Sequence, residues 1–200
     1  MPSKALSETF PEYLAFISVD VETAGKYPRD FALLSIGACN LPNPRKTFYI
    51  ELKPDKPGIS DGSTEVHGLS MKELQQKGVE PVEALQRFES WLAEVVPGEV
   101  TPIFVALNAP FDWMFVNDYF HHYLGRNPFG HKALDMKAFF MGMHRVPWAE
   151  TGFREIGQHY LKERVLAHNA LQDALDQAEM FQEMLEEAAK LPKPAHEEHL

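Results

Sequence analysis

The chain has 200 residues, of which 44% are hydrophobic and 24% charged, and these values suit one globular domain with a sizeable core. A net charge of −10 argues against adhesion to duplex nucleic acid through a broadly basic surface. With no long apolar run, no secretory leader pattern and the single cysteine Cys39, the sequence predicts a soluble cytoplasmic protein without a membrane span or a disulfide framework.

Three strands are expected after an N-terminal arm over residues 1–14. The stretch "YLAFISVDVE" (13–22) is apolar on both faces before its acids, and "DFALLSIGACNL" (30–41) and "TFYIEL" (47–52) follow it. The segment "PNPRK" reads as the turn between the last two. Together the three stretches predict a β-meander, followed by a long loop rich in proline, glycine and aspartate.

Helices and one buried strand are expected in the rest of the chain. A helix is predicted from Pro81 to "PGEV" (97–100), because its apolar residues recur at helical spacing. The wholly apolar run "TPIFVAL" (101–107) reads as a buried strand. Asn169 is expected to cap a long final helix. Further helical segments are predicted within residues 109–125, 131–144 and 153–161.

The predicted fold is therefore of the α/β class, with helices flanking one mixed sheet. The expected boundaries are the arm over 1–14, a single domain over 15–189 and a C-terminal tail over 190–200.

Charge is unevenly distributed along this chain. Residues 126–164 hold seven basic and four acidic side chains, which is either an ordinary solvated surface or a basic side facing a polyanion.

Two acids, Asp20 and Glu22, close the first predicted strand. Because side chains at positions i and i+2 of a strand leave on the same face, these carboxylates are expected to point together. Two carboxylates so placed repel each other unless a cation lies between them. The plain alternative is the solvated end of a strand.

A third acid, Asp112, follows the buried run in "FVALNAPFDWMFV" (104–116), where a strand gives way to a helix. Acids favour the first turn of a helix, so capping is one interpretation. The bulky apolar neighbours Phe111, Trp113 and Met114 instead place this carboxylate near the sheet, where a buried acid requires a partner.

The stretch "AHNALQDAL" supplies His168 and Asp173 at the start of the last helix. One interpretation is a surface histidine before an acidic helix. The other makes Asp173 a metal ligand and leaves His168 free to move a proton.

The patterns D-x-E, N-x-x-x-D and H-x-A-x-x-D occur in this order and together resemble the three motifs of the DEDDh 3′–5′ exonuclease superfamily. The resemblance covers residues 15–186 and implies a ribonuclease H-like sheet of three antiparallel strands followed by parallel ones. Within the superfamily, "DVETAG", "GRNPFG" with "ALDMKAFF", and "HNALQD" most resemble ribonuclease T. That narrower likeness implies tRNA processing by a homodimer whose second subunit supplies a basic patch.

The expected chemistry is metal-dependent hydrolysis of phosphodiester bonds. Asp20, Glu22, Asp112 and Asp173 are hard oxygen ligands, suited to two Mg²⁺ ions, for which Mn²⁺ can substitute. Two such ions neutralise the four carboxylates, activate a water and stabilise the leaving oxygen. His168 is the expected general base. The resemblance assigns Asp20 as the bridging ligand.

The resulting prediction is a 3′–5′ exonuclease acting on single-stranded 3′ ends, with RNA slightly favoured over DNA. The resemblance implies that Thr23 and Ala24 place backbone groups against the terminal nucleotide. Phe111 and Phe129 are candidates for stacking on a base, with core packing as the alternative. His67 is expected either to meet the terminal sugar or to fasten its loop.

Two positions depart from the family pattern. Many relatives carry a histidine where this chain has Leu107, and an apolar wedge residue where it has Lys26. Neither change removes a metal ligand, but both concern the fit of the substrate. The alternatives are a catalytically silent binding module of the same fold and a proofreading-type DNA exonuclease.

Overall fold

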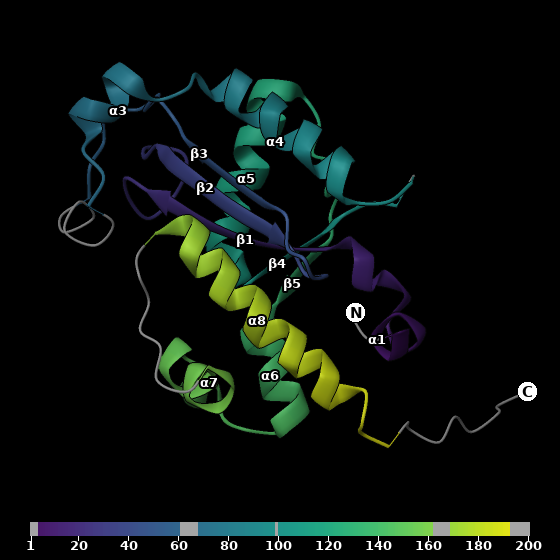
Figure 1. Ribbon diagram of the computed structural model, residues 1–200. Coiled ribbons are helices and arrows are strands. Elements are labelled where there is room, and N and C mark those ends of the chain that lie inside the picture. Colours follow the sequence, from purple (N-terminus) through teal and green to yellow (C-terminus); the bar gives the residue numbers. More distant parts are fainter. Residues whose placement is uncertain (1–3, 61–67, 99, 162–168, 193–200) are drawn as a thin grey trace, which may run out of the picture.

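A mixed five-stranded sheet forms the centre of the protein (Figure 1). The computed structural model describes residues 4–60, 68–98, 100–161 and 169–192. In these residues the strands are β1 (Phe16–Thr23), β2 (Leu33–Asn40), β3 (Thr47–Glu51), β4 (Ile103–Ala106) and β5 (Ala133–Asp135). Their order is β3-β2-β1-β4-β5, with β1, β2 and β3 antiparallel and β4 and β5 parallel to β1. The predicted α/β class and ribonuclease H-like sheet are confirmed.

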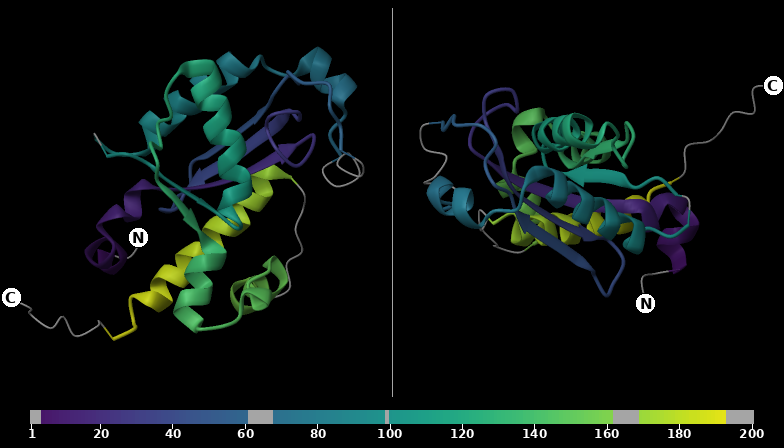
Figure 2. Two further views of the ribbon diagram at one scale, coloured as in Figure 1. Left: turned by 180° about the vertical axis from the view of Figure 1, so that it is seen from behind. Right: turned by 90° about the horizontal axis from the view of Figure 1, so that it is seen from above.

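Helices cover both faces of this sheet (Figure 2). Helix α8 packs across β1 and β2 on one face, while α4 and α5 cover the other. The helices are α1 (Lys4–Thr9), α3 (Met71–Lys77), α4 (Pro81–Val95), α5 (Ala109–Leu124), α6 (Met136–His144), α7 (Phe153–Tyr160) and α8 (Ala170–Ala188), with short 3₁₀ helices at Pro11–Ala15 and Trp148–Glu150.

The central strands are buried on both faces, as the apolar sequence of β1 and β2 requires. In β2, Ile36 and Ala38 point into the cluster formed with α4 and α5, whereas Cys39 joins the cluster beneath α8. In β1, Val19 and Val21 belong to the α4 and α5 side. Because side chains alternate along a strand, Asp20 is directed to the face that α8 covers.

Two helices were not anticipated from the sequence. Helix α1 and the 3₁₀ turn after it occupy the predicted arm, where Leu6 and Tyr13 are fully buried. The 3₁₀ turn also delays the start of β1 from Tyr13 to Phe16. Helix α3 buries only Leu74, so its sequence lacks the apolar stripe that predicts a helix.

The loop after β3 is anchored to α5 through Asp55. Its carboxylate accepts hydrogen bonds from the Tyr119 and Tyr123 hydroxyls, the latter at 2.7 Å, and pairs with Lys56 at 3.0 Å. The Tyr119 hydroxyl in turn accepts from the Leu33 amide at 2.8 Å. Although burial alone raises the pKa of Asp55, these hydrogen bonds outweigh it and hold the pKa below its usual value. The network links the loop, α5 and the start of β2.

Among the described residues, none of the helices has the length and apolar content that crossing a membrane demands.

Candidate active site

Strand β1 presents Ser18, Asp20 and Glu22 on the face of the sheet that carries α8. Asp20 pairs with Gly37 of the neighbouring strand, in the middle of the β1–β2 ladder. The pairing irregularity between Glu22 and Thr23 marks the end of this regular ladder. Both carboxylates are thus fixed by a rigid, hydrogen-bonded strand.

The first turns of α8 lie directly against this strand pair. A Cβ atom on Gly37 would come within 2.1 Å of the Ala170 carbonyl carbon and 2.3 Å of the Leu171 nitrogen. One turn further along, the Ser18 hydroxyl donates to the Ala174 carbonyl at 2.8 Å. Only a glycine in β2 therefore permits this close approach of helix and sheet.

This approach brings Asp173 to the two acids of β1. Carboxylate oxygens of Asp20, Glu22 and Asp173 all lie within 4.8 Å of one another. Asp173 is 3% exposed, and the helix begins at its N-cap Asn169, whose side chain accepts from the Gln172 amide. The cap prediction is confirmed, and it sets the position of Asp173 in the first turn.

Asp112 comes from the other side, in the first turn of α5. Its Oδ1 accepts a hydrogen bond from the Val21 amide at 3.1 Å, so it lies between the two acids of β1 along the strand. The start of α5 is held by Asp135, whose carboxylate accepts from the Ala109 amide at 3.0 Å and from the Ala138 amide at 3.1 Å. One carboxylate thereby satisfies amides at the beginning of both α5 and α6.

The electrostatics show that the four acids form one group. The pKa of Asp20 is raised well above its usual value, first by burial and then by the charges of Asp112, Glu22 and Asp173. Burial and then Asp173 raise the pKa of Glu22 to about 7. Burial raises that of Asp112 to about 8, even though the Val21 amide opposes the shift.

These carboxylates fit the divalent cations that the sequence predicts. Burial and mutual repulsion both disfavour the ionised forms of these carboxylates. A positive ion between them would offset the repulsion and the loss of hydration. Their oxygens are the hard ligands that Mg²⁺ and Mn²⁺ prefer. The arrangement can therefore hold divalent metal, although the choice of ion stays a prediction.

Gln177 is a residue of the site that sequence reasoning missed. Its amide nitrogen donates to Asp20 Oδ1 at 2.7 Å, and its amide oxygen accepts from the Leu107 backbone at 2.8 Å. It is 2% exposed and lies one turn after Asp173 on the same face of α8. The signal available in the sequence was a polar residue four positions after Asp173, within the apolar stripe of the predicted last helix. Gln177 orients the Asp20 carboxylate.

One of the expected substrate contacts is corrected, and a second finds its backbone groups bonded within the fold. Phe129 is 0% exposed and packs against Phe88, Phe104 and Trp113, so it is a core residue that offers no ring face to a base. The backbone of Ala24 is already used, because its amide donates to Ala32 at 2.8 Å and its carbonyl accepts from Ser60 at 2.7 Å. Both groups are thus engaged within the fold, and the backbone contact of Ala24 with a nucleotide stays a prediction.

The other expected contacts have different outcomes. Thr23 is buried, and its hydroxyl donates to the Gly25 carbonyl at 2.7 Å. Phe111 is half-buried, directly before Asp112, and its role in stacking stays a prediction. His67 and His168 lie outside the described residues.

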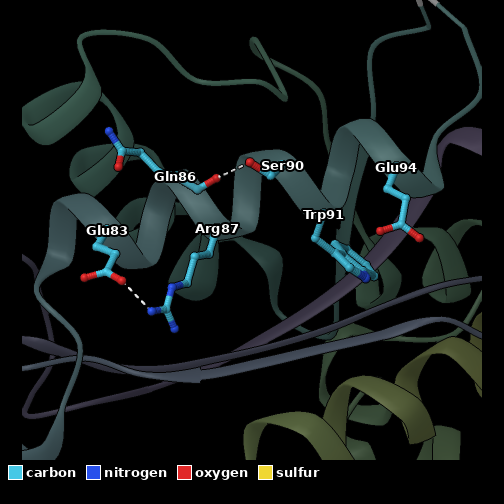
Figure 3. Close-up of a pocket in the computed structure, with 6 residues that line it drawn as sticks. All are labelled: Glu83, Gln86, Arg87, Ser90, Trp91 and Glu94. Atoms are coloured by element: carbon cyan, nitrogen blue, oxygen red, sulfur yellow. Dashed lines mark hydrogen bonds and ion pairs between the residues drawn. The ribbon is translucent and has the colours of Figure 1, made fainter.

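A separate hollow runs along the outer side of α4 (Figure 3). Arg87 there pairs with Glu83, and the Ser90 hydroxyl donates to the Gln86 carbonyl, so these groups bond within the helix. Trp91 packs against the core ring Phe88. The acids of β1 and α8 do not line this hollow, so the candidate active site remains the carboxylate group.

This sheet, with acids supplied by its first strand and by the starts of two helices, is the architecture of the DEDDh 3′–5′ exonucleases. The family model described as "Exonuclease" (RNase_T) matches residues 17–181, a span that contains all four carboxylates. The chain belongs to this exonuclease family.

Among curated proteins, it is 43% identical over 180 residues to the "3'-5' DNA exonuclease Cap18" of Escherichia coli, covering 89% of this chain and 96% of that protein. Among solved structures, the nuclease domain of 3'hExo bound to rAMP, described as a DEDDh family member, matches with a TM-score of 0.73. That match has 16% identity and covers 88% of this chain and 94% of the other. Cell-death related nuclease 4 matches with a TM-score of 0.68 at 16% identity, covering 86% and 64%.

Proposed function

We propose that this protein is a metal-dependent 3′–5′ exonuclease that hydrolyses phosphodiester bonds at the 3′ end of single-stranded DNA. The observation that carries the proposal is the convergence of Asp20, Glu22 and Asp173 oxygens within 4.8 Å, in a chain that belongs to the exonuclease family. The 43% identity to a protein named as a DNA exonuclease supports DNA as the substrate.

The preference for RNA expected from the sequence finds no support in this relative. That expectation rested on the likeness to ribonuclease T in three short motifs, whereas the likeness to Cap18 extends over 89% of the chain. The predicted tRNA processing, homodimer and cytoplasmic location stay predictions. The proposed partner is the 3′ end of a nucleic acid, bound as the substrate.

Asp20, Glu22, Asp112 and Asp173 would hold the metal. When bound, two divalent ions supply an activated water and stabilise the leaving oxygen of the phosphodiester. Gln177 keeps the Asp20 carboxylate in one orientation, and the Val21 amide does the same for Asp112. We assign His168 as the general base, whose imidazole takes the proton of the attacking water.

The test is to incubate the protein with 5′-labelled single-stranded DNA and with RNA of the same sequence, in Mg²⁺, Mn²⁺ or excess chelator. Stepwise shortening from the 3′ end of DNA, abolished by chelator, is the expected result. Failure to shorten either polymer with any metal would refute the exonuclease. Faster shortening of RNA would keep the exonuclease and overturn the choice of DNA.

A matched pair of variants on α5 tests the site. Asp112→Asn should lower the rate by more than about a hundredfold, because it removes the charge of a metal ligand, and a misplacement of the reacting groups by about 1 Å already costs that much. Asp118→Asn removes an exposed carboxylate from the same helix and should leave the rate unchanged. Equal rates for the two variants would contradict the assigned role of Asp112.

A further inference from the structure

A second group of side chains that could hold a metal ion lies among α6, α7 and the C-terminal part of α8. It contains His144 at the end of α6, His159 in the last turn of α7 and Glu187 in the last turn of α8. The carboxylates of the active site lie toward the other end of α8, near Asp173. The group is therefore a separate feature, built by three helices that are distant in sequence.

The distances within this group approach those of a metal centre. Glu187 Oε2 lies 3.8 Å from His144 Nε2 and 3.7 Å from His159 Nε2. One ligand atom from each of the three residues falls within 4.8 Å of the other two. Around a tetrahedral zinc with bonds of about 2.0–2.1 Å, neighbouring ligand atoms are about 3.4 Å apart. Shifts of a few tenths of an ångström would bring Glu187 Oε2 to this spacing from both histidine nitrogens, whereas the two histidine ligand atoms lie within 4.8 Å of each other.

The type of ligand selects the type of ion. Imidazole nitrogens suit zinc and other late transition metals, whereas Mg²⁺ and Ca²⁺ prefer oxygen ligands. Two histidines and one glutamate are a zinc-binding set, and they leave a fourth position for water. The active-site group consists of oxygen ligands, so the two groups differ in the metals they select.

Neighbouring side chains hold these ligands in place. The Tyr160 hydroxyl donates to Glu187 Oε2 at 2.9 Å and lies 3.0 Å from His144 Nε2. Burial, followed by the hydrogen bond to Glu187, raises the pKa of Tyr160. A bound ion would replace the contact between His144 and Tyr160, while Tyr160 would continue to orient Glu187 as an outer-shell donor.

The rings of this cluster also restrict one another. The His144 and His159 rings lie 5.0 Å apart, and Phe140 packs against His144 at 4.3 Å between ring centroids. The His144 side chain is 18% exposed, whereas that of His159 is 49% exposed. One ligand is therefore fixed from inside the fold, and the other leaves a path for an ion to enter.

We propose that His144, His159 and Glu187 form a second metal site, which binds one Zn²⁺ ion with water as the fourth ligand. The ion joins the ends of α6, α7 and α8. It lies on the helical side of the fold, apart from the carboxylates, and takes no part in their chemistry.

The test is to titrate the metal-free full chain with Zn²⁺ by calorimetry, in an excess of Mg²⁺ that occupies the carboxylates. Wild-type protein should bind one equivalent of Zn²⁺ more than His159→Ala or Glu187→Gln. Co²⁺ in place of Zn²⁺ should give the intense visible absorption of a four-coordinate ion in the wild type and lose it in both variants. Zn²⁺ should also raise the unfolding temperature of the wild type more than that of the variants.

Two further variants separate a metal site from a hydrogen-bonded cluster. Tyr160→Phe should keep the additional equivalent but weaken its binding by roughly 10–100-fold, as loss of an outer-shell partner does. His131→Ala removes an exposed histidine and should bind like the wild type. Equal stoichiometry and affinity in the wild type, His159→Ala and Glu187→Gln, each confirmed as folded by its unfolding temperature without metal, would overturn the proposal.

Discussion

Replacing Gly37 with alanine tests how the position of α8 determines the geometry of the active site. The added methyl carbon would lie 2.1 Å from the Ala170 carbonyl carbon and 2.2 Å from its oxygen. Both atoms are backbone, so no side-chain rotation can relieve the overlap. Since carbon atoms rest about 3.5 Å apart, the helix and the strand must separate by about 1.4 Å.

This displacement increases the distance between Asp173 of α8 and the acids of β1, which the geometry of the active site requires to be short. Asp173 lies in the same helical turn as Ala170, and Asp20 is the β1 partner of Gly37. Separating the helix from the strand therefore increases the distance between the Asp20 and Asp173 carboxylates. Misplacement by about 1 Å can cost about a hundredfold in rate. Overpacking of this kind also lowers the free energy of unfolding by about 1–3 kcal/mol.

The assay is turnover on labelled single-stranded DNA, measured well below the unfolding temperature of Gly37→Ala, with stability followed by denaturant unfolding. Gly142→Ala is the matched control, because nothing lies within 4 Å of its added carbon in α6. That control should keep its activity and gain about 0.5–1 kcal/mol of stability, since alanine is the better helix former. A folded Gly37→Ala protein with wild-type turnover would refute the proposed coupling between helix position and activity.

Three further substitutions test the supports of the site and the fold. Gln177→Leu leaves the Leu107 amide without its acceptor and Asp20 without its donor, so it should lower the free energy of unfolding by about 1–3 kcal/mol and also lower turnover. Unaltered kinetics would contradict the orienting role of Gln177. Asp20→Asn should abolish turnover yet raise the unfolding temperature in chelator by about 2 °C or more, because burial and then the neighbouring acids disfavour the ionised carboxylate; a lower temperature would contradict this. Asp55 has a lowered pKa in the folded state, so its ionised form stabilises the fold above about pH 4, and this stability is lost as the pH falls through the folded pKa. Asp55→Asn should therefore unfold more easily at pH 7 and show a smaller loss on acidification, whereas an unchanged pH profile of unfolding would count against the network.

Much of the fold follows from local patterns in the sequence. The apolar runs of β1, β2 and β4 and the 3-to-4 spacing in α4 and α8 are strong because each element has a buried face. Helices α1 and α3 escaped prediction because Leu6 in α1 and Leu74 in α3 are the buried residues among their described side chains, so no apolar stripe is visible. Their positions depend on tertiary contacts.

The active site was predictable to the extent that its residues fall in motifs. Four acids were found because their spacing is distinctive, but Gln177, Asp135 and Gly37 act through neighbours that are distant in sequence. Phe129 shows the opposite error, since the sequence alone does not distinguish a core ring from an exposed one. Such roles follow from packing, which local sequence does not encode.

The hydrogen bond from the Leu107 amide to Gln177 has a consequence for how this protein tolerates sequence change. Because the donor is main chain, nineteen of the twenty amino acids can supply it, so this bond does not depend on the side chain at position 107, which packs against the cluster beneath α8. Proline alone would remove the donor. The acceptor is the side-chain amide of Gln177, so substitutions at position 107 should preserve this bond more often than substitutions at position 177. A library randomised at both positions should retain active clones with several apolar residues at 107 and few residues at 177.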